Sequence, residues 1–176
     1  IAANINASKI LNCYNKANVT GTSYVGGIAG YSVSSPQISN CYNRGNIHLN
    51  ATTPTNKTVA GIMGYFNTGS IANTYNTGNI TAGHTDAISR GPIVGTTKAI
   101  VNSYFLDTSA VGGNDNGISK TNAEMITQNM VDLLNGTQSP LAWSFDIEGN
   151  NDTYPVLSWE NPPLEAILTT KNVSCF

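Results

Sequence analysis

The sequence predicts an all-β solenoid, namely a parallel β-helix of about three to four coils with a C-terminal cap that contains a helix. The first observation is a pattern of Ile, any residue, Asn, any residue and Tyr, which occurs four times at spacings of 28, 33 and 29 residues. The second is a glycine-rich motif about midway between successive copies. Two interleaved motifs with one period are typical of a solenoid, whose units bury their apolar faces only against one another. The first pattern starts at Ile10, Ile38, Ile71 and Ile100, and the second covers residues 25–31 and 59–65, with a degenerate copy at 91–95.

Length and composition exclude several classes of function. The chain has 176 residues, of which 10% are charged, and its formal net charge is −2. Because no run of Lys or Arg is present to neutralise a phosphate backbone, we expect no nucleic acid partner. No stretch approaches the roughly 20 apolar residues of a spanning helix, so we expect no membrane insertion by this segment. Residues 1–6 do not resemble a signal peptide, and we expect the segment to lie within a larger protein or to have been processed.

Each repeat is predicted to contain three short strands and no helix. In the first repeat these are residues 10–14, a piece around 18–20 and residues 24–31. The period of roughly 30 residues matches one three-sided coil of a parallel β-helix. Equivalent Asn residues are predicted to form an amide ladder, and the glycines to lie at corners with positive φ or at close backbone approaches. The ladder residues are Asn12, Asn40, Asn73 and Asn102, continued by Asn43, Asn46, Asn76 and Asn79, and the glycines are Gly26, Gly27, Gly30, Gly61, Gly64, Gly91 and Gly95.

Two further repeat positions bear on how the coils pack. Cys13 and Cys41 share one position, and the odd count of three cysteines does not suggest a disulfide framework. We expect an inward column of small residues there, which Thr74 and Ser103 continue. Pro92 replaces the second glycine of its motif, which predicts that the last coil is near an edge, because Pro has no amide to donate to a ladder.

The chain divides into three predicted parts. The repeats occupy residues 1–105, a C-terminal cap occupies residues 106–159, and residues 160–176 form a linker or the start of another module. The cap is expected to close the C-terminal end of the solenoid, where strand edges would otherwise be exposed.

The cap is predicted to contain one helix over residues 122–135. Thr121 and Glu124 form a capping-box pattern ahead of apolar residues at helical spacing, and Gly136 follows the last of them. The single apolar stripe predicts that the helix lies against the end or the side of the solenoid. The bulky residues expected in the capping layer are Trp143, Phe145, Tyr154, Val156, Leu157 and Trp159.

The repeated tyrosines have two interpretations. In the first they pack as a buried, stacked aromatic column along one face. In the second they form an exposed strip that stacks on sugar rings, whose apolar CH faces need a flat partner. Periodicity does not choose between them, because the Asn between Ile and Tyr could lie at a bend that resets the alternation. These candidate ligand-binding residues are Tyr14, Tyr42, Tyr75 and Tyr104.

Few residues are suited to catalysis or to metal binding. The two histidines, His48 and His84, lie at unrelated repeat positions, and Asp86 is the single acidic residue within residues 10–105. This pattern does not match a zinc protease, a catalytic triad or the clustered carboxylates of a polysaccharide lyase or hydrolase. We therefore expect a non-enzymatic protein with no cofactor and no metal site. The weak calcium candidates, with ordinary Asx-turn loops as the alternative, are Asp107, Asn114, Asp115 and Asn116, and a second group of Asp146, Glu148 and Asp152.

Several of these motifs together resemble the GLUG repeat of large bacterial surface proteins. The resemblance covers residues 10 to about 105 and extends to the segment that follows. The fourth copy departs from the pattern at Phe105, Leu106 and Asp107. The residues that carry the resemblance are Cys13-Tyr14-Asn15, Val25-Gly26-Gly27-Ile28-Ala29-Gly30-Tyr31, Cys41-Tyr42-Asn43, Gly45-Asn46-Ile47 and, after the repeats, Glu124-Met125, Val131-Asp132-Leu133-Leu134-Asn135, Trp143, Asp146 and Tyr154-Pro155-Val156-Leu157-Ser158-Trp159.

The resemblance implies a secreted or wall-anchored bacterial module, because that repeat occurs in adhesin-like proteins and in the non-catalytic part of some immunoglobulin A proteases. We accordingly expect an extracellular or cell-surface stalk or adhesion module that holds neighbouring domains of a larger chain apart. One alternative is a module that binds glycan or a host extracellular protein. The other is the accessory region of a secreted protease or glycosidase.

Overall fold

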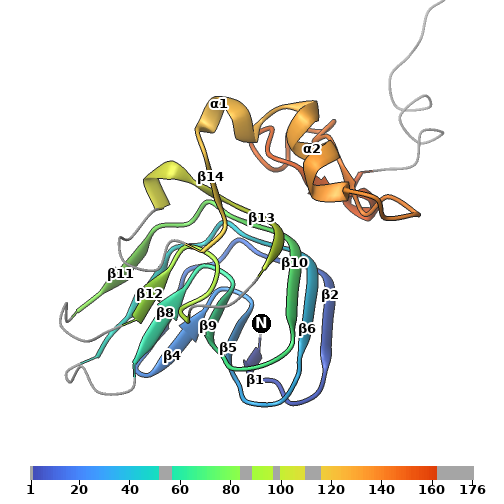
Figure 1. The fold of residues 1–176 in the computed structure, drawn as a ribbon. Coiled ribbons are helices and arrows are strands. Elements are labelled where there is room, and N and C mark those ends of the chain that lie inside the picture. The colour runs from blue at the N-terminus through green and yellow to red at the C-terminus, as the bar shows by residue number, and fades with distance from the viewer. Residues whose placement is uncertain (1, 52–56, 84–88, 97–99, 110–115, 162–176) are drawn as a thin grey trace, which may run out of the picture.

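In the computed structural model, which describes residues 2–51, 57–83, 89–96, 100–109 and 116–161, the chain winds into a β-solenoid of about three turns (Figure 1). Parallel strands of successive coils stack in four ladders. A C-terminal segment with two short helices lies beside the stack (Figure 1). The predicted all-β solenoid is therefore confirmed.

Each complete coil has four strands, one more than predicted. The segment expected at residues 24–31 is divided at Gly27 and Ile28, where the amides of Ile28 and Ala29 both donate to the carbonyl of Ile62 and the chain turns. The strands are β1 (Ala2–Asn4), then β2 (Lys9–Asn15), β3 (Val19–Gly21), β4 (Tyr24–Gly26) and β5 (Ala29–Ser32) in the first full coil, β6 (Gln37–Asn43), β7 (Ile47–Leu49), β8 (Thr58–Ala60) and β9 (Met63–Phe66) in the second, β10 (Ser70–Asn76), β11 (Ile80–Ala82) and β12 (Ser89–Gly91) in the third, and finally β13 (Val101–Leu106) and β14 (Ile118–Lys120).

The coils stack in the register that the repeat predicts. Tyr42 is the parallel partner of Tyr14 on one side and of Tyr75 on the other, and Tyr75 pairs in turn with Tyr104. The sheet that carries these residues has the order β14-β13-β10-β6-β2. Among the described strands, β12 is an edge strand of the sheet β12-β8-β4, and Pro92 directly follows it, as expected for a last coil near an edge.

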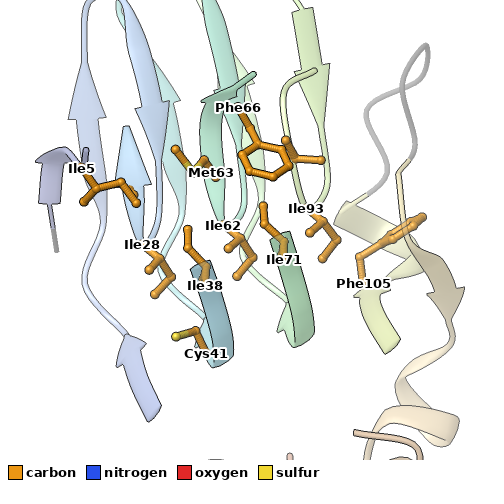
Figure 2. Packing of buried hydrophobic residues seen from close by; sticks show 12 residues of the cluster. Ile5, Ile28, Ile38, Cys41, Ile62, Met63, Phe66, Ile71, Ile93 and Phe105 are labelled. Atoms are coloured by element: carbon orange, nitrogen blue, oxygen red, sulfur yellow. The ribbon is translucent and has the colours of Figure 1, made fainter. Parts of the chain in front are cut away.

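A bend in the first strand of every coil sets which side chains face the interior. Asn12, Asn40, Asn73 and Asn102 all have positive φ, between 43° and 54°. Asn tolerates this left-handed conformation better than most residues, and one such residue interrupts the alternation of a strand. As a result, Ile38 faces the interior and so does Cys41, three residues later (Figure 2).

The interior has two apolar clusters. The larger contains Ile28, Ile38, Ile62 and Ile71 between the tyrosine-bearing sheet and the sheet of β1, β5 and β9 (Figure 2). The smaller lies between the other two sheets and consists of Val25, Ile47, Leu49, Ala51, Val59 and Ile80. The predicted inward column of small residues belongs to the larger side: Cys41, Thr74 and Ser103 are buried, and Cys13 packs partly buried against the cluster. Cys13 and Cys41 are free thiols, and Cys175 lies outside the described residues.

A buried amide ladder lies between the two clusters. The Nδ2 of Asn15 donates to Oδ1 of Asn43 at 2.7 Å, and Nδ2 of Asn43 donates to Oδ1 of Asn76 at 2.7 Å. Along the chain, Asn43 separates Cys41 of one cluster from Ile47 of the other. The ladder ends in the fourth copy because Phe105 is the register partner of Asn76.

The predicted position of the ladder was therefore only partly right. Among the four Asn residues with positive φ, Nδ2 of Asn102 donates to Oδ1 of Asn73 at 3.1 Å, but Oδ1 of Asn40 accepts no hydrogen bond. The reason is that the left-handed bend turns these side chains toward the outside. A second, exposed ladder runs through Asn46, whose Oδ1 accepts the amide of Asn79 at 3.1 Å. The predicted bond between side chains is therefore confirmed for Asn43 and Asn76, whereas Asn46 and Asn79 are joined through the backbone amide of Asn79.

The motif glycines are needed for close packing and not for positive φ. A Cβ on Gly27 would lie 2.3 Å from the carbonyl oxygen of Gly61 and 2.5 Å from Cγ of Asn43. A Cβ on Gly61 would lie 2.3 Å from Cγ of Asn76. Each of these glycine motifs therefore packs directly on the ladder Asn of the strand that carries the tyrosine pattern in the next coil. This packing explains why the two motifs share one period.

The predicted helix over residues 122–135 is two helices, α1 (Asn122–Met125) and α2 (Gln128–Asn135). Thr127 interrupts it: its hydroxyl donates to the carbonyl of Glu124 and accepts the amide of Met130, so it caps the second helix. The predicted capping box of Thr121 and Glu124 is present. Gly136 ends α2 with φ of 53°, as predicted.

The helices and the strands β15 (Trp143–Ser144) and β16 (Val156–Leu157) lie along the side of the solenoid (Figure 1). Of the two placements predicted for the helix, end or side, the structure has the side. On the last coil, β14 pairs with β13, and Asn116 donates to the carbonyls of Val94 and Thr96. The expectation that residues 106–159 close the C-terminal end is wrong for α1, α2, β15 and β16, because these elements pack on the outward tyrosines.

Candidate functional site

The outward tyrosines of the repeats form a stacked column. The rings of Tyr42 and Tyr75 have centroids 4.9 Å apart and an interplanar angle of 4°, and the rings of Tyr14 and Tyr42 are 4.9 Å apart at 12°. This spacing is close to the distance between neighbouring strands, because the rings are in register on adjacent coils. The column is therefore a direct consequence of the repeat.

The C-terminal segment covers most of this column. Tyr42 and Tyr75 are 0% exposed and Tyr104 is 3% exposed, in one cluster with apolar residues of α1, α2 and β15. The hydroxyl of Tyr75 donates to the carbonyl of Pro155 and accepts from Nδ2 of Asn151. The described arrangement is thus the buried column, and the alternative of an exposed sugar-binding strip through Tyr42, Tyr75 and Tyr104 loses its main support.

Polar contacts from the second coil hold the segment on the column. The hydroxyl of Tyr42 donates to the carboxylate of Glu160 at 2.9 Å. Arg44 donates to the carbonyl of Asn151 at 2.7 Å, forms an ion pair with Asp152 at 2.8 Å, and lies with its guanidinium carbon 4.5 Å from the ring centroid of Tyr154. The contacts of Arg44 join the second coil to the loop between β15 and β16, and the bond of Tyr42 joins it to the turn that follows β16.

Burial makes the column sensitive to alkali. Burial raises the pKa of Tyr42 and of Tyr75 well above the ordinary value of 10.0, and the negative charge of Glu160 acts in the same direction. Burial also raises the pKa of the Cys41 thiol to about 12. The folded protein therefore keeps these protons at pH values where the unfolded chain has released them.

We expect the free energy of unfolding to fall as pH rises above about 10, because the unfolded state then binds fewer protons than the folded state. Cys41 contributes first, because its thiol titrates near 9.0 in the unfolded chain. Below about pH 8 none of these groups should affect the pH dependence. Urea unfolding at a series of pH values would measure this. A Tyr75→Phe variant should show a shallower decline above pH 10, and an equal slope in the variant and the parent would contradict the assignment to the column.

The calcium candidates make turn-type contacts. Oδ1 of Asp107 accepts the amide of Thr108, and the carboxylate of Asp146 accepts the amides of Asn150, Asn151 and Thr153. Asn114 and Asp115 lie outside the described residues. Within the described ranges no three His, Cys, Asp or Glu side chains gather closely enough to hold a metal ion. The contacts fit the Asx-turn alternative.

The exposed end of the tyrosine column was not predicted as a site. Trp159 stacks on Tyr14, with ring centroids 5.9 Å apart at 20°, and it is 60% exposed. Trp159 lines two clefts. One contains Lys16, Asp146 and Glu160, and the other is lined by uncharged residues that include Asn12, Asn40 and Gln138. Trp159 was expected in the capping layer, and no periodic signal marks it, since it follows the repeats.

A second group of tyrosines was also missed as a cluster. Tyr24, Tyr31 and Tyr65 contact one another with ring centroids 4.9–5.3 Å apart, and all three are half-buried. They come from β4, β5 and β9, which adjoin at the division of the glycine motif. Because the prediction joined β4 and β5 into one strand, it did not bring Tyr24 next to Tyr31.

These features define a β-solenoid repeat protein whose coils carry a laterally covered aromatic column. The GLUG motif matches residues 21–47, which run from the end of β3 through β6 to the start of β7. The chain thus carries a GLUG motif, consistent with the GLUG-type repeat region expected from the sequence. No curated protein and no solved structure shows significant similarity to the chain. No helix in the described ranges is long and apolar enough to cross a membrane.

Proposed function

We propose that this chain is a non-enzymatic stalk or adhesion module of an extracellular, cell-surface protein, in which the solenoid holds neighbouring domains apart. The observation that carries the proposal is the continuity of the stack: backbone ladders, an amide ladder and an aromatic column all run from coil to coil. The GLUG motif supports a repeat module of a larger protein. The surface location is supported by the resemblance of the repeats to those of bacterial surface proteins.

The geometry suits a stiff spacer. Each coil adds about 4.8 Å along the axis, and its strands bond to the coils on both sides. The C-terminal segment then braces the stack, since it contacts Lys16 of the first full coil, Arg44 of the second and Tyr75 of the third. Such a brace resists bending because the coils cannot separate on that side without breaking its contacts.

The module can also continue a stack. In the described ranges β2, β3 and β4 of the first full coil are edge strands of their sheets. The fourth strand of that coil, β5, is already paired with β1 of the preceding coil. Edge strands have backbone groups available to a further parallel strand. This arrangement supports a role as one module in a longer array of coils.

Surface labelling of the cells that produce the protein would test the proposed location. Antibodies raised against the folded repeats should label intact cells as strongly as permeabilised ones, and an internal cytosolic protein should be labelled only after permeabilisation. Labelling that required permeabilisation would overturn the extracellular role.

The spacer role needs a separate measurement on the same protein. Replacing residues 9–161 with a Gly/Ser linker should broaden the distance distribution between probes on the flanking domains, because such linkers behave as flexible coils. A distribution that stayed as narrow as in the parent would contradict a stiff stalk.

A further inference from the structure

The uncharged cleft beside Trp159 has the features of a small-molecule site. Its volume is about 410 Å³, and it lies between the outward bends of β2 and β6 and the loop that follows α2. Its lining includes Asn12 and Asn40 from the solenoid and Gln138, Leu141 and Trp159 from the C-terminal segment. No residue that lines the cleft is charged. The volume falls in the range of ordinary ligand pockets.

The aromatic wall of the cleft is preformed. Trp159 is held by its stack on Tyr14, and 60% of its surface remains exposed. Leu141, another residue of the lining, is 61% exposed. Large apolar surface left open beside polar groups is a feature of binding sites, because exposing it to water has a cost that a ligand would remove.

The polar wall has unused hydrogen-bonding capacity. Oδ1 of Asn40 is buried without any hydrogen-bond donor, whereas the equivalent Oδ1 of Asn73 accepts from Asn102. A buried acceptor without a donor is unfavourable. Asn40 also lines the cleft, and rotation of its amide about the broad χ2 torsion would break no hydrogen bond at this oxygen, so the oxygen is available to a ligand hydroxyl.

We propose that this cleft binds a neutral saccharide unit. Sugar rings combine an apolar CH face, which suits the indole of Trp159, with hydroxyls that suit the amides of Asn12, Asn40 and Gln138. An anionic sugar would find no cation among the lining residues. The inference gives a ligand to the adhesion part of the proposed function, on which it rests, and it places glycan binding away from the tyrosine strip considered in the sequence analysis. It is independent of the spacer role, so its failure would leave that role unchanged.

Binding can be measured on the whole chain with neutral methyl glycosides of glucose, galactose, mannose, N-acetylglucosamine and N-acetylgalactosamine. The chain has two tryptophans, and Trp143 is buried, so a Trp143→Phe background would make Trp159 the single fluorophore. We expect at least one glycoside to protect Trp159 from acrylamide quenching and to show saturation-transfer contacts through its ring CH protons. Absence of both signals up to tens of millimolar of every glycoside would overturn the proposal.

Two matched pairs of variants would locate the site. Trp159→Ala should weaken binding about tenfold or more, whereas Phe145→Ala, an exposed aromatic outside the cleft lining, should change it less than about twofold. Asn40→Gly should weaken binding several-fold, and Asn73→Gly should not. Glycine suits the positive φ of both Asn positions, so neither change strains the backbone.

Further outcomes decide against the site. Equal loss of affinity in Trp159→Ala and Phe145→Ala would show that the cleft is not where binding occurs. Tighter binding of sulfated or sialylated glycosides that weakened with salt would contradict a neutral ligand. Should Trp159→Ala fail to fold, as judged by circular dichroism, Gln138→Ala, an exchange at a partly exposed side chain of the same cleft, must reduce affinity for the proposal to stand.

Discussion

Replacing Asn43 with Ala is expected to lower the free energy of unfolding by about 3 kcal/mol, because it removes two buried hydrogen bonds and one part-buried bond and leaves a cavity. Asn43 accepts from Asn15 and donates to Asn76 and to the carbonyl of Gly45. The carbonyl of Gly45 would be left without this donor between two apolar clusters, where water does not replace it. Urea unfolding followed by circular dichroism would measure the loss.

The matched control is Asn46→Ala, three residues along the same coil. Asn46 is exposed and its side chain accepts one bond, from the amide of Asn79. Because water can replace that bond, the expected loss is below about 1 kcal/mol. If the two variants were equally stable, the buried ladder would not be the structural element that joins the coils.

Replacing Gly27 with Ala is expected to cost about 3 kcal/mol or more, or to prevent folding. The new Cβ would lie 2.3 Å from a backbone oxygen of the next coil and 2.5 Å from the Asn43 side chain. Neither neighbour can move without breaking ladder bonds, so the two segments would have to separate. Thermal and urea unfolding of the variant would measure the effect.

Gly83→Ala is the control for this substitution. A Cβ there would meet nothing closer than 3.6 Å, and the position is exposed. We expect no loss, or a gain of about 0.5 kcal/mol through lower entropy of the unfolded chain. A combined Gly27→Ala/Asn43→Ala variant adds a further check, since removal of the amide should relieve part of the clash and make the two effects non-additive. Strict additivity would show that the two positions do not pack on each other.

Most of the fold follows from the spacing of the repeats. The tyrosine pattern alone predicts which residues pair across coils, and the observed partners of Tyr42 are those that it requires. The inward position of Cys41 and Thr74 and the edge position of Pro92 follow in the same way. These features were predictable because stacking in register is a local rule that every coil repeats.

The details inside a coil were less predictable. The division of the glycine motif at Gly27 depends on carbonyl partners in the next coil, which a strand pattern does not specify. Likewise, the buried ladder passes through Asn43 and not Asn40, because positive φ at Asn40 turns its side chain outward. Both outcomes depend on backbone conformation. Asn and Gly each allow several backbone conformations, so a motif of these residues does not specify which one occurs.

The repeat is thus sufficient to specify a parallel solenoid, its register and its aromatic column, since each is a relation between equivalent residues one period apart. The repeat does not specify whether that column is buried or exposed. Whether Tyr75 is buried or free to bind a ligand depends on the non-repeating segment, whose Pro155 and Asn151 meet it 80 and 76 residues along the chain. The exposed stack of Trp159 on Tyr14 likewise joins two segments without a shared pattern. Contacts between a repeat and a non-repeating segment have no periodicity to reveal them, so they emerge only when the chain is folded.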